Sequence, residues 1–487
     1  MRSLGSTRAC VENSSLAPRV HLSLLHACSL LKTLTAPLAR RISTRRPSAA
    51  AAASVTESTA PPQVKREGKE KEKRKRTRAV TTGAPPSPSL PTTTKKKKKT
   101  LSFHLYIDVI TSHPANNVTD AVFDKIGASL HTRPEHPIAI IKDAIYAYFD
   151  AAAASRGAAG PGKTAFTKFD GLHPVVPATA NFDEVLVPAD HVSRSPNDTY
   201  YVDDATVLRC HTSAHQAATL RSGERAFLVT GDVYRRDSID CSHYPVFHQM
   251  EGVRVFDQAE WEAAGLPDGT ALAEKELKGL LEGLAAHLFG PAAKTRWVDA
   301  YFPFTHPSFE LEVLFNGEWM EVLGCGVMQP AILGNAGLGG EGAPAVSAWA
   351  FGLGLERLAM CLFQIPDIRL FWSADPRFTR QFKAGSMASR FKPYSKYPPC
   401  FKDVSFWVPA AGLSENDMCE VVRGIAGDLA EAVTLIDAFT HPKTGKSSAC
   451  YRIAYRSMER SLEDEEINAI QERVREALAE GKGVELR

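Results

Sequence analysis

The sequence lacks a long uninterrupted apolar segment. No uncharged apolar run in the 487 residues approaches the ~18 residues that a membrane-spanning helix needs. It also lacks paired cysteines: the nine cysteines are scattered, odd in number and never form a CxxC motif. These absences disfavour a membrane protein, a disulfide-stapled secreted domain and a zinc finger, and they fit a reducing compartment.

The charges are divided unevenly along the chain. Residues 1–100 contain 22 Lys or Arg and five Asp or Glu, a net charge of +17. Residues 101–487 contain 36 basic and 50 acidic residues, a net charge of −14. The total of +3 therefore combines a basic tail with an acidic body. The body is long enough for two or three domains with buried cores.

The first segment, residues 1–56, has the composition of an organellar transit peptide. It contains eight Lys or Arg, one acidic residue and nine serines, and its apolar stretch 22–34 is interrupted by His26 and Lys32. Transit peptides are amphipathic, rich in Arg and Ser, and poor in acids. We therefore predict delivery to the mitochondrial matrix, the chloroplast stroma or both. The alternative is a disordered tail that carries no address.

The next segment, residues 57–113, is of low complexity. Lys65–Arg78 holds nine basic and three acidic residues, and Lys95–Lys99 is an unbroken lysine run. Such a composition cannot bury enough apolar surface to offset the entropy of ordering, so we predict a disordered basic linker. A nuclear signal or a nucleic-acid-binding arm is the alternative, because the positive charge would attract polyanions.

The body alternates helical and strand-like patterns, which predicts an α+β fold. Apolar positions between Ile138 and Tyr148 recur every three or four residues, as on one face of a helix. The patterns predict helices at 137–150, 259–290 and 351–363, a Gly-rich loop at 331–346, and strands at 184–187, 206–208, 226–229, 253–256, 296–301, 309–315 and 319–324. We assign residues 114–375 to one domain and the Ser-, Lys- and Pro-rich residues 376–396 to a linker.

The last segment, residues 397–487, has an element order that can be read directly. Strands are predicted at 400–408, 433–439, 448–456 and 484–486, with a helix at 414–429 and another that begins after Ser461 and ends at Gly481. This order, βαββαβ, is that of a ferredoxin-like domain.

The sheet face that these helices leave open carries basic residues. We consider four of them candidates for RNA binding: Lys443, Lys446, Arg452 and Arg456. An arginine-bearing sheet is a workable platform for single-stranded RNA. An ordinary solvated face is the alternative.

Residues 157–164 satisfy the phosphate-loop spacing GxxxxGK[ST]. That motif works only between a strand and a helix, where stacked amides and a helix N-terminus meet the phosphates. Here a predicted helix and an alanine run precede it, and Phe169-Asp170-Gly171 follows closely. We therefore predict a flexible surface loop.

Three spaced motifs remain. They are HTSAHQ at 211–216, VYRRD at 233–237 with FHQMEG at 247–252, and FGLGLERLAM at 351–360 followed by IPDIR. The second and third resemble motifs 2 and 3 of class II aminoacyl-tRNA synthetases, and the helix after His136-Pro137 resembles motif 1. The finer pattern, with Phe302-Pro303-Phe304, is similar to phenylalanyl-tRNA synthetases of the single-chain organellar type. The resemblance spans about residues 114–487.

This resemblance implies both fold and function. The fold would be a class II synthetase domain, a mixed and mainly antiparallel sheet flanked by helices, joined to a ferredoxin-like anticodon-binding domain. The reaction would be ATP-dependent ligation of L-phenylalanine to tRNA(Phe) through phenylalanyl-adenylate, for organellar translation. A monomer without membrane association is expected, because the catalytic and anticodon-binding parts share one chain.

Amino-acid activation needs positioning and charge neutralisation more than a general base. The substrate carboxylate is already ionised at pH 7 when it attacks the α-phosphorus of ATP. The resemblance implies catalytic roles for Arg235, on the α-phosphate and carboxylate, and for Arg357, on the γ-phosphate and adenine. It adds three further ATP-binding residues: His243, Phe247 and Glu356. Mg²⁺ is expected, and its ligands are open, with Glu321 as one candidate.

The resemblance also implies an amino-acid site. Its residues are His211, Ser213, Ala214, His215, Gln216, Ser242, Tyr244, Gln249, Met250, Glu251, Phe302, Phe304, Glu321, Ala350 and Phe351. Glu251 would accept hydrogen bonds from the α-ammonium group, and Phe302 and Phe304 would pack on the substrate ring. No segment is large enough for an editing domain, so the pocket itself would have to reject tyrosine.

Two alternative functions stay open at this point. One is a synthetase-like paralogue that binds ATP and an amino acid but has a non-translational role. The other is a basic-armed RNA-binding protein without catalysis. The intact Arg235, Phe247, Glu356 and Arg357 disfavour the second, and the complete C-terminal domain disfavours the first.

Overall fold

The computed structural model describes residues 113–155, 165–339, 345–394 and 396–487. The predicted transit peptide, nearly all of the basic linker and the phosphate-loop-like segment lie outside the described residues. Within the described part, no helix has the length and apolar character needed to cross a bilayer. No disulfide joins the seven described cysteines, in agreement with their irregular spacing.

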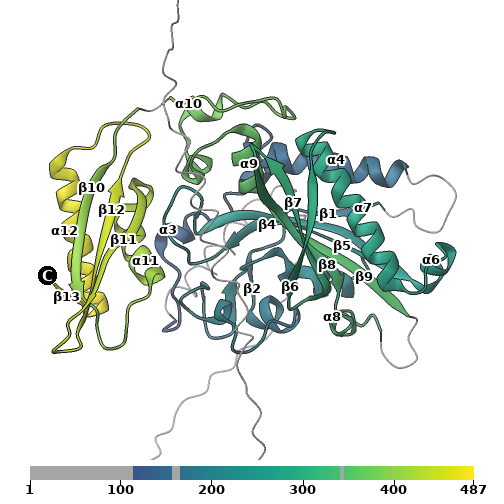
Figure 1. Cartoon of the computed structure of the whole chain (residues 1–487), viewed down its shortest axis with the longest axis horizontal. Coiled ribbons are helices and arrows are strands. Elements are labelled where there is room, and N and C mark those ends of the chain that lie inside the picture. The colour runs from purple at the N-terminus through teal and green to yellow at the C-terminus, as the bar shows by residue number, and fades with distance from the viewer. Residues whose placement is uncertain (1–112, 156–164, 340–344, 395) are drawn as a thin grey trace, which may run out of the picture. The chain divides into compact units, whose positions relative to one another are not determined.

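A seven-stranded sheet forms the centre of the larger domain (Figure 1). Its spatial order is β1-β4-β5-β9-β8-β7-β6, and all neighbours are antiparallel except β1 and β4. The strands are β1 (Thr167–Phe169), β4 (Ala226–Tyr234), β5 (Val246–Asp257), β6 (Thr295–Phe302), β7 (Thr305–Phe315), β8 (Glu318–Met328) and β9 (Val346–Gly354). A separate pair joins β2 (Val175–Pro177) to β3 (Thr206–Leu208). The mixed, mainly antiparallel sheet is thus confirmed.

Three helices pack on one face of this sheet: α4 (Pro137–Ser155), α7 (Gly269–Phe289) and α9 (Leu355–Phe363) (Figure 1). Pro137 opens α4, where its missing N–H costs nothing. Ile138, Ile141, Ile145 and Phe149 then fall on one helix face and are fully buried. Each such side chain contributes roughly 1.5–3 kcal/mol by leaving water.

The opposite face of the sheet is covered by shorter elements. Two short helices lie there: α5 (Gln216–Arg221) and α8 (Pro330–Asn335). The other short helices, α3 (Asp120–Phe123), α6 (Gln258–Ala263) and α10 (Pro376–Thr379), contribute to the main core instead. Leu220 of α5 and Ile332 and Leu333 of α8 form a second apolar cluster with strands β4, β5 and β9. Because β4 is covered on both faces, all nine of its residues are buried, polar ones included.

The predicted linker packs onto the same domain. Phe378, Phe382 and Phe391 are buried in the main core and contact one another through their rings. The chain between the two sheets is therefore anchored by aromatic side chains over much of its length.

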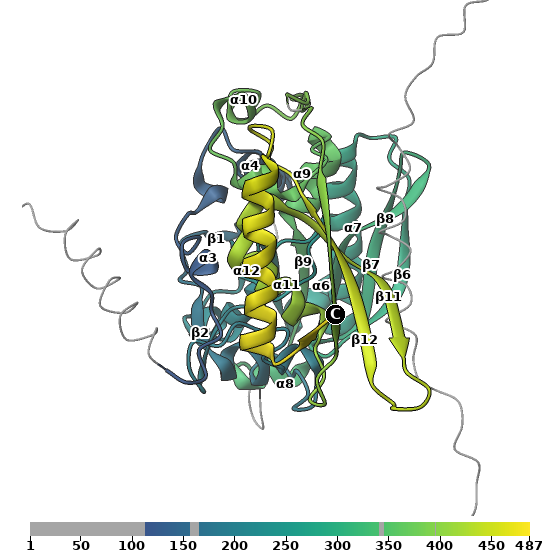
Figure 2. The same ribbon diagram turned by 90° about the vertical axis from the view of Figure 1, so that its left-hand side faces the viewer.

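The C-terminal domain has the predicted βαββαβ order (Figure 1). Figure 2 shows its helix α12 and strands β11 and β12 from a second side. Its elements are β10 (Cys400–Trp407), α11 (Glu415–Ala426), β11 (Ala430–Thr440), β12 (Ser447–Tyr455), α12 (Asp464–Lys482) and β13 (Glu485–Leu486), with sheet order β11-β12-β10-β13. Ser414 caps α11 by accepting from the amide of Asp417, as expected. Phe406, Ile453 and Val474 are fully buried between helices and sheet.

One predicted strand and one predicted loop were wrong. Residues 184–187 follow a π-helical turn at Thr179–Asp183 and do not form a strand; Leu186 has a positive φ of 61°. The run of β-branched and apolar residues there is buried in a small cluster instead. In the predicted loop 331–346, Pro330 starts the short helix α8.

Two helix boundaries were also wrong. Residues 351–354 belong to β9, and α9 begins only at Leu355, because an apolar run does not distinguish a buried strand from a helix. In the C-terminal domain, α12 has Glu463 as its N-cap residue and ends at Gly483, which adopts φ 64°. The left-handed position that glycine favours is therefore two residues beyond the predicted Gly481.

Candidate active site

A cavity of about 650 Å³ opens against the seven-stranded sheet. Its walls come from β5, β8 and β9, the turn between β6 and β7, and the short 3₁₀ helix Thr212–His215. Eleven of the predicted site residues line it: His211, Ser213, Gln216, Arg235, Gln249, Glu251, Phe302, Phe304, Glu321, Ala350 and Phe351. Residues from His211 to Phe351, 140 positions apart in the chain, thus converge on one cavity.

Glu251 provides a buried acceptor in this cavity. Its side chain is 2% exposed, and Oε2 accepts a hydrogen bond from Ser213 Oγ. Gln216 and Thr212 also lie close enough to lower the pKa of the Glu251 carboxyl, but no described donor meets hydrogen-bond geometry at Oε1. The buried Oε1 of Gln216 likewise has no donor among the described residues. A group with several N–H donors, such as an ammonium ion, would satisfy both of these acceptors in the cavity.

Burial changes the protonation of two groups here. It raises the pKa of Glu251 to about 7, with the hydrogen bond from Ser213 acting in the opposite direction. Burial, together with the positive charge of Arg235, lowers the pKa of His211 to about 3. His211 is therefore neutral at physiological pH, whereas Glu251 is poised to ionise when a cation arrives.

The apolar end of the cavity is aromatic. The rings of Phe302 and Phe304 lie parallel, with centroids 5.7 Å apart. Gly324 lies beneath Phe302: a Cβ there would come within 2.7 Å of the ring atom Cζ. Ala350, 5% exposed, closes the wall with a single methyl group. The space suits a flat apolar side chain.

Two arginines supply positive charge. Arg235 Nε donates to the Cys210 carbonyl at 2.9 Å, and its guanidinium lies 5.1 Å from the centre of the Phe247 ring. Arg357, whose side chain is 45% exposed, pairs with Glu321 at 3.3 Å. Because Glu321 lines the cavity, this pair places Arg357 at the rim.

Glu310 lies near this rim. Its pKa is raised, first by burial and then by the negative charges of Glu321 and Glu312. Mutual repulsion between carboxylates marks a place where a cation would be stabilising. No group of three or more His, Cys, Asp or Glu in the described ranges is arranged to hold a metal ion. One or two carboxylates suffice, however, for Mg²⁺ that is carried by nucleotide phosphates.

Five predicted amino-acid-site residues lie away from the cavity lining. Ala214 and Met250 are buried in apolar clusters. His215 turns toward the buried Arg209, whose Nη1 lies 2.7 Å from His215 Nε2. Ser242 and Tyr244 belong to the loop between β4 and β5. Ser242 Oγ donates to Asp240 at 2.8 Å, and Tyr244 lines a smaller hollow.

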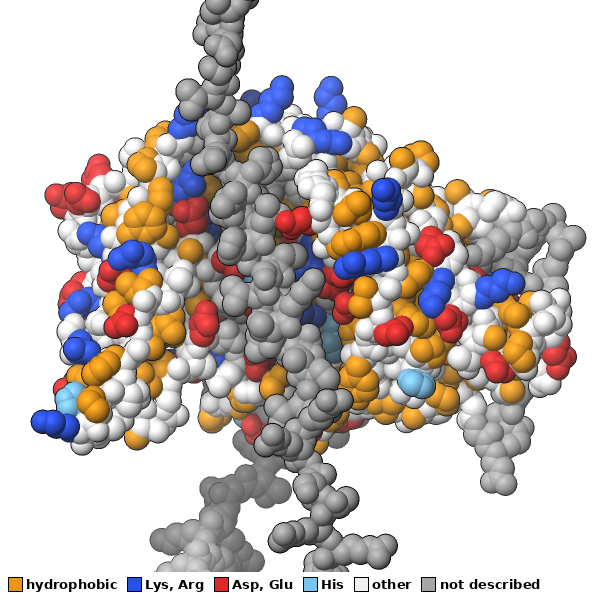
Figure 3. All heavy atoms as spheres, in the orientation of Figure 1, with side chains coloured by type: hydrophobic (Ala, Val, Ile, Leu, Met, Phe, Trp, Pro, Cys, Tyr) orange, Lys and Arg blue, Asp and Glu red, His pale blue; other side chains and the backbone are white. Residues whose placement is uncertain are grey.

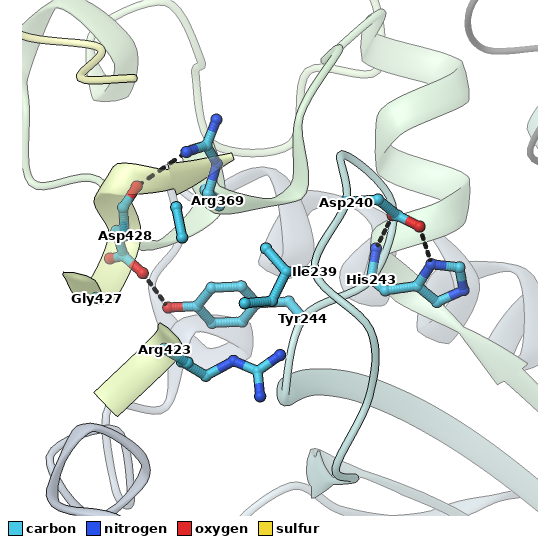
Figure 4. Close-up of a pocket in the computed structure, with 9 residues that line it drawn as sticks. Ile239, Asp240, His243, Tyr244, Arg369, Arg423, Gly427 and Asp428 are labelled. Carbon is cyan, nitrogen blue, oxygen red and sulfur yellow. Dashed lines mark hydrogen bonds and ion pairs between the residues drawn. The ribbon is translucent and has the colours of Figure 1, made fainter. Parts of the chain in front are cut away.

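That hollow is shown in Figure 4. Asp240 holds the loop by accepting from His243 Nδ1 at 2.7 Å and from the His243 amide at 2.8 Å. This hydrogen bond raises the pKa of His243. Tyr244 donates to Asp428 of the C-terminal domain at 2.7 Å. His243, expected at ATP, is thus held in a defined loop beside the cavity and not in its lining.

Glu356 is also absent from the cavity lining. It is 3% exposed, and both of its carboxylate oxygens contact His248. Glu356 lies in the first turn of α9, one residue before Arg357, and its side chain contacts β5.

Sequence reasoning did not single out several lining residues. They include Thr199, Thr212, Tyr301, Cys325 and Asn416. Tyr301 is 81% exposed, and its position beside Phe302 was the only available signal. Asn416 comes from α11, and no local pattern could have predicted that the C-terminal domain supplies a lining residue.

The candidate RNA-binding residues are mostly paired. Arg452 donates to Asp403 at 2.8 Å, Arg456 to Glu431 at 3.1 Å, and Lys446 to Glu485 at 3.1 Å. Lys446 and Arg487 also flank the Trp407 ring, at 5.9 and 4.7 Å from its centre. Figure 3 shows basic, histidine and apolar side chains together at the end of the β11–β12 hairpin, the region of Lys443.

Comparisons with known proteins agree with this architecture. The family model for the class II core domain of tRNA synthetases (F) matches residues 163–382, and the model for the ferredoxin-fold anticodon binding domain matches residues 395–487.

Similar proteins occur in several organisms. The chain is 60% identical over 374 residues to the chloroplastic/mitochondrial phenylalanine–tRNA ligase of Arabidopsis thaliana, covering 77% of this chain and 83% of that protein. It is 48% identical to the mitochondrial enzyme of Mus musculus, covering 76% and 85%, and 38% identical to that of Saccharomyces cerevisiae, covering 77% and 93%. With this likeness over both domains, the chain belongs to the organellar phenylalanine–tRNA ligases, a family of class II aminoacyl-tRNA synthetases.

Proposed function

We propose that this chain activates L-phenylalanine with ATP and transfers it to tRNA(Phe) for translation in an organelle. The observation that carries the proposal is the combination of Glu251 with the Phe302–Phe304 wall in one cavity. The buried carboxylate of Glu251 favours a cationic group. The aromatic pair at the other end selects a flat apolar side chain.

In the first step, the phenylalanine carboxylate attacks the α-phosphorus of ATP, and the bond to pyrophosphate breaks. Ser213, Gln216 and Glu251 would hold the ammonium group, and Gln249 would orient the carboxylate. Arg235 would draw the carboxylate and α-phosphate together and neutralise the charge that builds there. Arg357 at the rim would bind the outgoing phosphates, with Phe247 and Arg357 on the two faces of adenine.

Glu321 and Glu310 fit the Mg²⁺ that accompanies ATP in this proposal. They are partly exposed oxygen ligands beside Arg357, and their mutual repulsion would be relieved by a cation. Bound there, the ion would neutralise phosphate charge.

In the second step, a terminal ribose hydroxyl of tRNA attacks the phenylalanyl carbonyl, and AMP leaves. The C-terminal domain would bind the anticodon arm. On its sheet, Trp407 between Lys446 and Arg487 offers a stacking surface flanked by positive charge. Lys443 would extend this surface, while Arg452 and Arg456 would first have to exchange their carboxylate partners.

The test is ATP–pyrophosphate exchange with each amino acid in turn, followed by charging of organellar tRNA. We expect exchange with phenylalanine and charging of tRNA(Phe). No phenylalanine-dependent exchange would overturn the proposal. Exchange without charging would favour the paralogue with a non-translational role.

We further propose a monomer that is delivered by residues 1–56. Light scattering of the purified chain tests the first point, and a mass above one chain would contradict it. Microscopy of a fluorescent protein fused to residues 1–56 tests the second and identifies the organelle. A diffuse signal would contradict targeting.

A further inference from the structure

His248 of β5 and Glu356 of α9 form a buried pair beneath the active site. Glu356 Oε2 accepts from the His248 amide at 2.7 Å, and Oε1 lies 2.7 Å from His248 Nδ1. His248 is fully buried and Glu356 is 3% exposed. Neither lines the cavity. The pair therefore cannot touch a substrate held there.

The His248–Glu356 pair lies where the pairing between β5 and β9 ends. Strands β5 and β9 are paired up to Gln249 and Gly354, and there β9 gives way to α9. The next amide of β5, that of His248, has no β9 carbonyl to meet. The Glu356 carboxylate takes that place, so one side chain continues the pairing of β5 into the first turn of the helix.

The neighbours of the pair are the proposed ATP and amino-acid contacts. Phe247 and Gln249 flank His248, and strand alternation directs them to the opposite side of β5. Arg357 directly follows Glu356 and reaches the rim through its contact with Glu321. Fixing His248 to Glu356 therefore fixes Phe247 relative to Arg357.

The imidazole is held on its other sides as well. The Trp372 ring stacks on it with a centroid distance of 6.1 Å, and the His131 ring lies 5.2 Å away. Because its neighbours confine the His248 ring, the ring cannot rotate to compensate for loss of its hydrogen bond to Glu356. Such a loss would therefore shift the first turn of α9.

We infer that the His248–Glu356 pair is a positioning device that aligns Arg357 with Phe247 for ATP. Glu356 thus acts through Arg357, without contacting the nucleotide. The inference rests on the proposed function, since it assigns the pair a role in the same reaction.

The test compares Glu356→Ala, Glu356→Gln and wild type in exchange assays, at a temperature where all are folded. For Glu356→Ala we expect a fall in kcat/KM for ATP of about 100-fold, the usual cost of a misplaced contact, and a change in KM for phenylalanine below about twofold. Glu356→Gln should stay within about threefold of wild type. Its amide oxygen can accept from the His248 amide, while its NH₂ donates to Nδ1 of the other histidine tautomer.

A matched control is Glu260→Ala, which removes one of the two carboxylates paired with the buried Arg254, at 2.9 Å, outside the cavity lining. It should lower Tm but leave both KM values unchanged. If Glu356→Ala behaves like this control, or if folded Glu356→Gln is as defective as Glu356→Ala, the inference is overturned. If Glu356→Ala does not fold, Glu356→Asp decides: its carboxylate is too short to keep both contacts, and kcat/KM for ATP must fall.

Calorimetric titration with ATP tests whether Glu356 acts through Arg357. In the Arg357→Ala background, adding Glu356→Ala should change the ATP Kd by less than about twofold. Full additivity of the two losses would contradict the inference. Failure of the proposed function is distinguishable, because wild type itself would then show no phenylalanine-dependent exchange.

Discussion

Gly231 and Arg209 lie so close that a Cβ on the glycine would come 2.0 Å from Arg209 Nη2. The Arg209 side chain is fully buried, and Nη2 donates to Asp232 Oδ1 at 3.0 Å while Nε donates to the Asp232 carbonyl at 2.7 Å. On its other side, Nη1 contacts His215, at the end of the 3₁₀ helix that carries Ser213. The Arg209 guanidinium thus connects β4 with the 3₁₀ helix that carries Ser213 of the amino-acid site.

We expect Gly231→Ala to destabilise the domain. The methyl group would displace the guanidinium and leave Asp232 without its buried partner, which costs about 3–5 kcal/mol. Urea unfolding measures the loss. Gly352→Ala is the control, because nothing lies within 4 Å of a Cβ at Gly352, and its stability should stay within about 0.5 kcal/mol of wild type. Equal stabilities of the two variants would contradict the expectation.

The raised pKa of Glu251 predicts that stability falls and affinity for phenylalanine rises as the pH increases. Its pKa is about 7 when folded, above its usual 4.5, so the folded state holds the proton more tightly. Its contribution to stability is therefore complete below pH 4.5 and is lost as pH rises toward 7. Phenylalanine needs the ionised form, so its affinity should increase about tenfold per pH unit over this window and level off above it.

Calorimetric titration with phenylalanine, together with thermal unfolding, from pH 5 to about pH 8 checks this pair of slopes. Glu251→Gln cannot ionise and should bind weakly with no such slope. An affinity in wild type that is flat across the range would show that Glu251 does not carry the ammonium contact.

Much of this site could be predicted from the sequence, because the family resemblance rests on short motifs that are local in the chain. Gln249 and Glu251 lie two residues apart on one strand and do face the same cavity. Strand alternation, applied strictly, excludes Met250, which is buried on the other side. Arg209 could not be predicted, because its partners Asp232 and His215 come from elements that only the folded sheet brings together.

In the fold, too, features set by local sequence could be predicted, whereas features set by contacts between distant segments could not. The order of elements in the C-terminal domain follows from periodicity. The strand conformation of residues 351–354 does not, because it depends on pairing with β5 and β8, which are remote in sequence. Glu356 was expected at ATP from its place beside Arg357, and only the position of His248 explains why it is buried.

Gly324→Ala should weaken phenylalanine binding selectively. The new methyl group would lie 2.7 Å from Phe302 Cζ and push the ring toward the substrate. We expect KM for phenylalanine to rise about tenfold and KM for ATP to stay the same, with a loss of stability of about 1–3 kcal/mol from overpacking. Exchange assays at varied phenylalanine give the answer. An unchanged KM would mean that the Phe302 ring does not form the wall.

Arg357→Ala should abolish exchange while the protein stays folded. The side chain is 45% exposed, and its pair with Glu321 at 3.3 Å is worth less than about 1 kcal/mol. Loss of the phosphate contact should lower kcat/KM for ATP by about 1000-fold. Arg377→Ala, which removes a similarly exposed arginine paired with Asp375, is the matched control and should keep normal exchange. Near-normal exchange by Arg357→Ala would refute its role.

Trp407→Ala should impair charging of tRNA without affecting amino-acid activation. Loss of one stacked base costs about 1–3 kcal/mol, so kcat/KM for tRNA should fall roughly 10- to 100-fold. Exchange does not involve tRNA and should remain normal. The control is Arg460→Ala, which removes a basic side chain that is 54% exposed and paired with Glu466, in the segment before α12. If both variants charge tRNA equally well, the anticodon arm does not use the Trp407 surface, and the paired Arg452 becomes the next position to test.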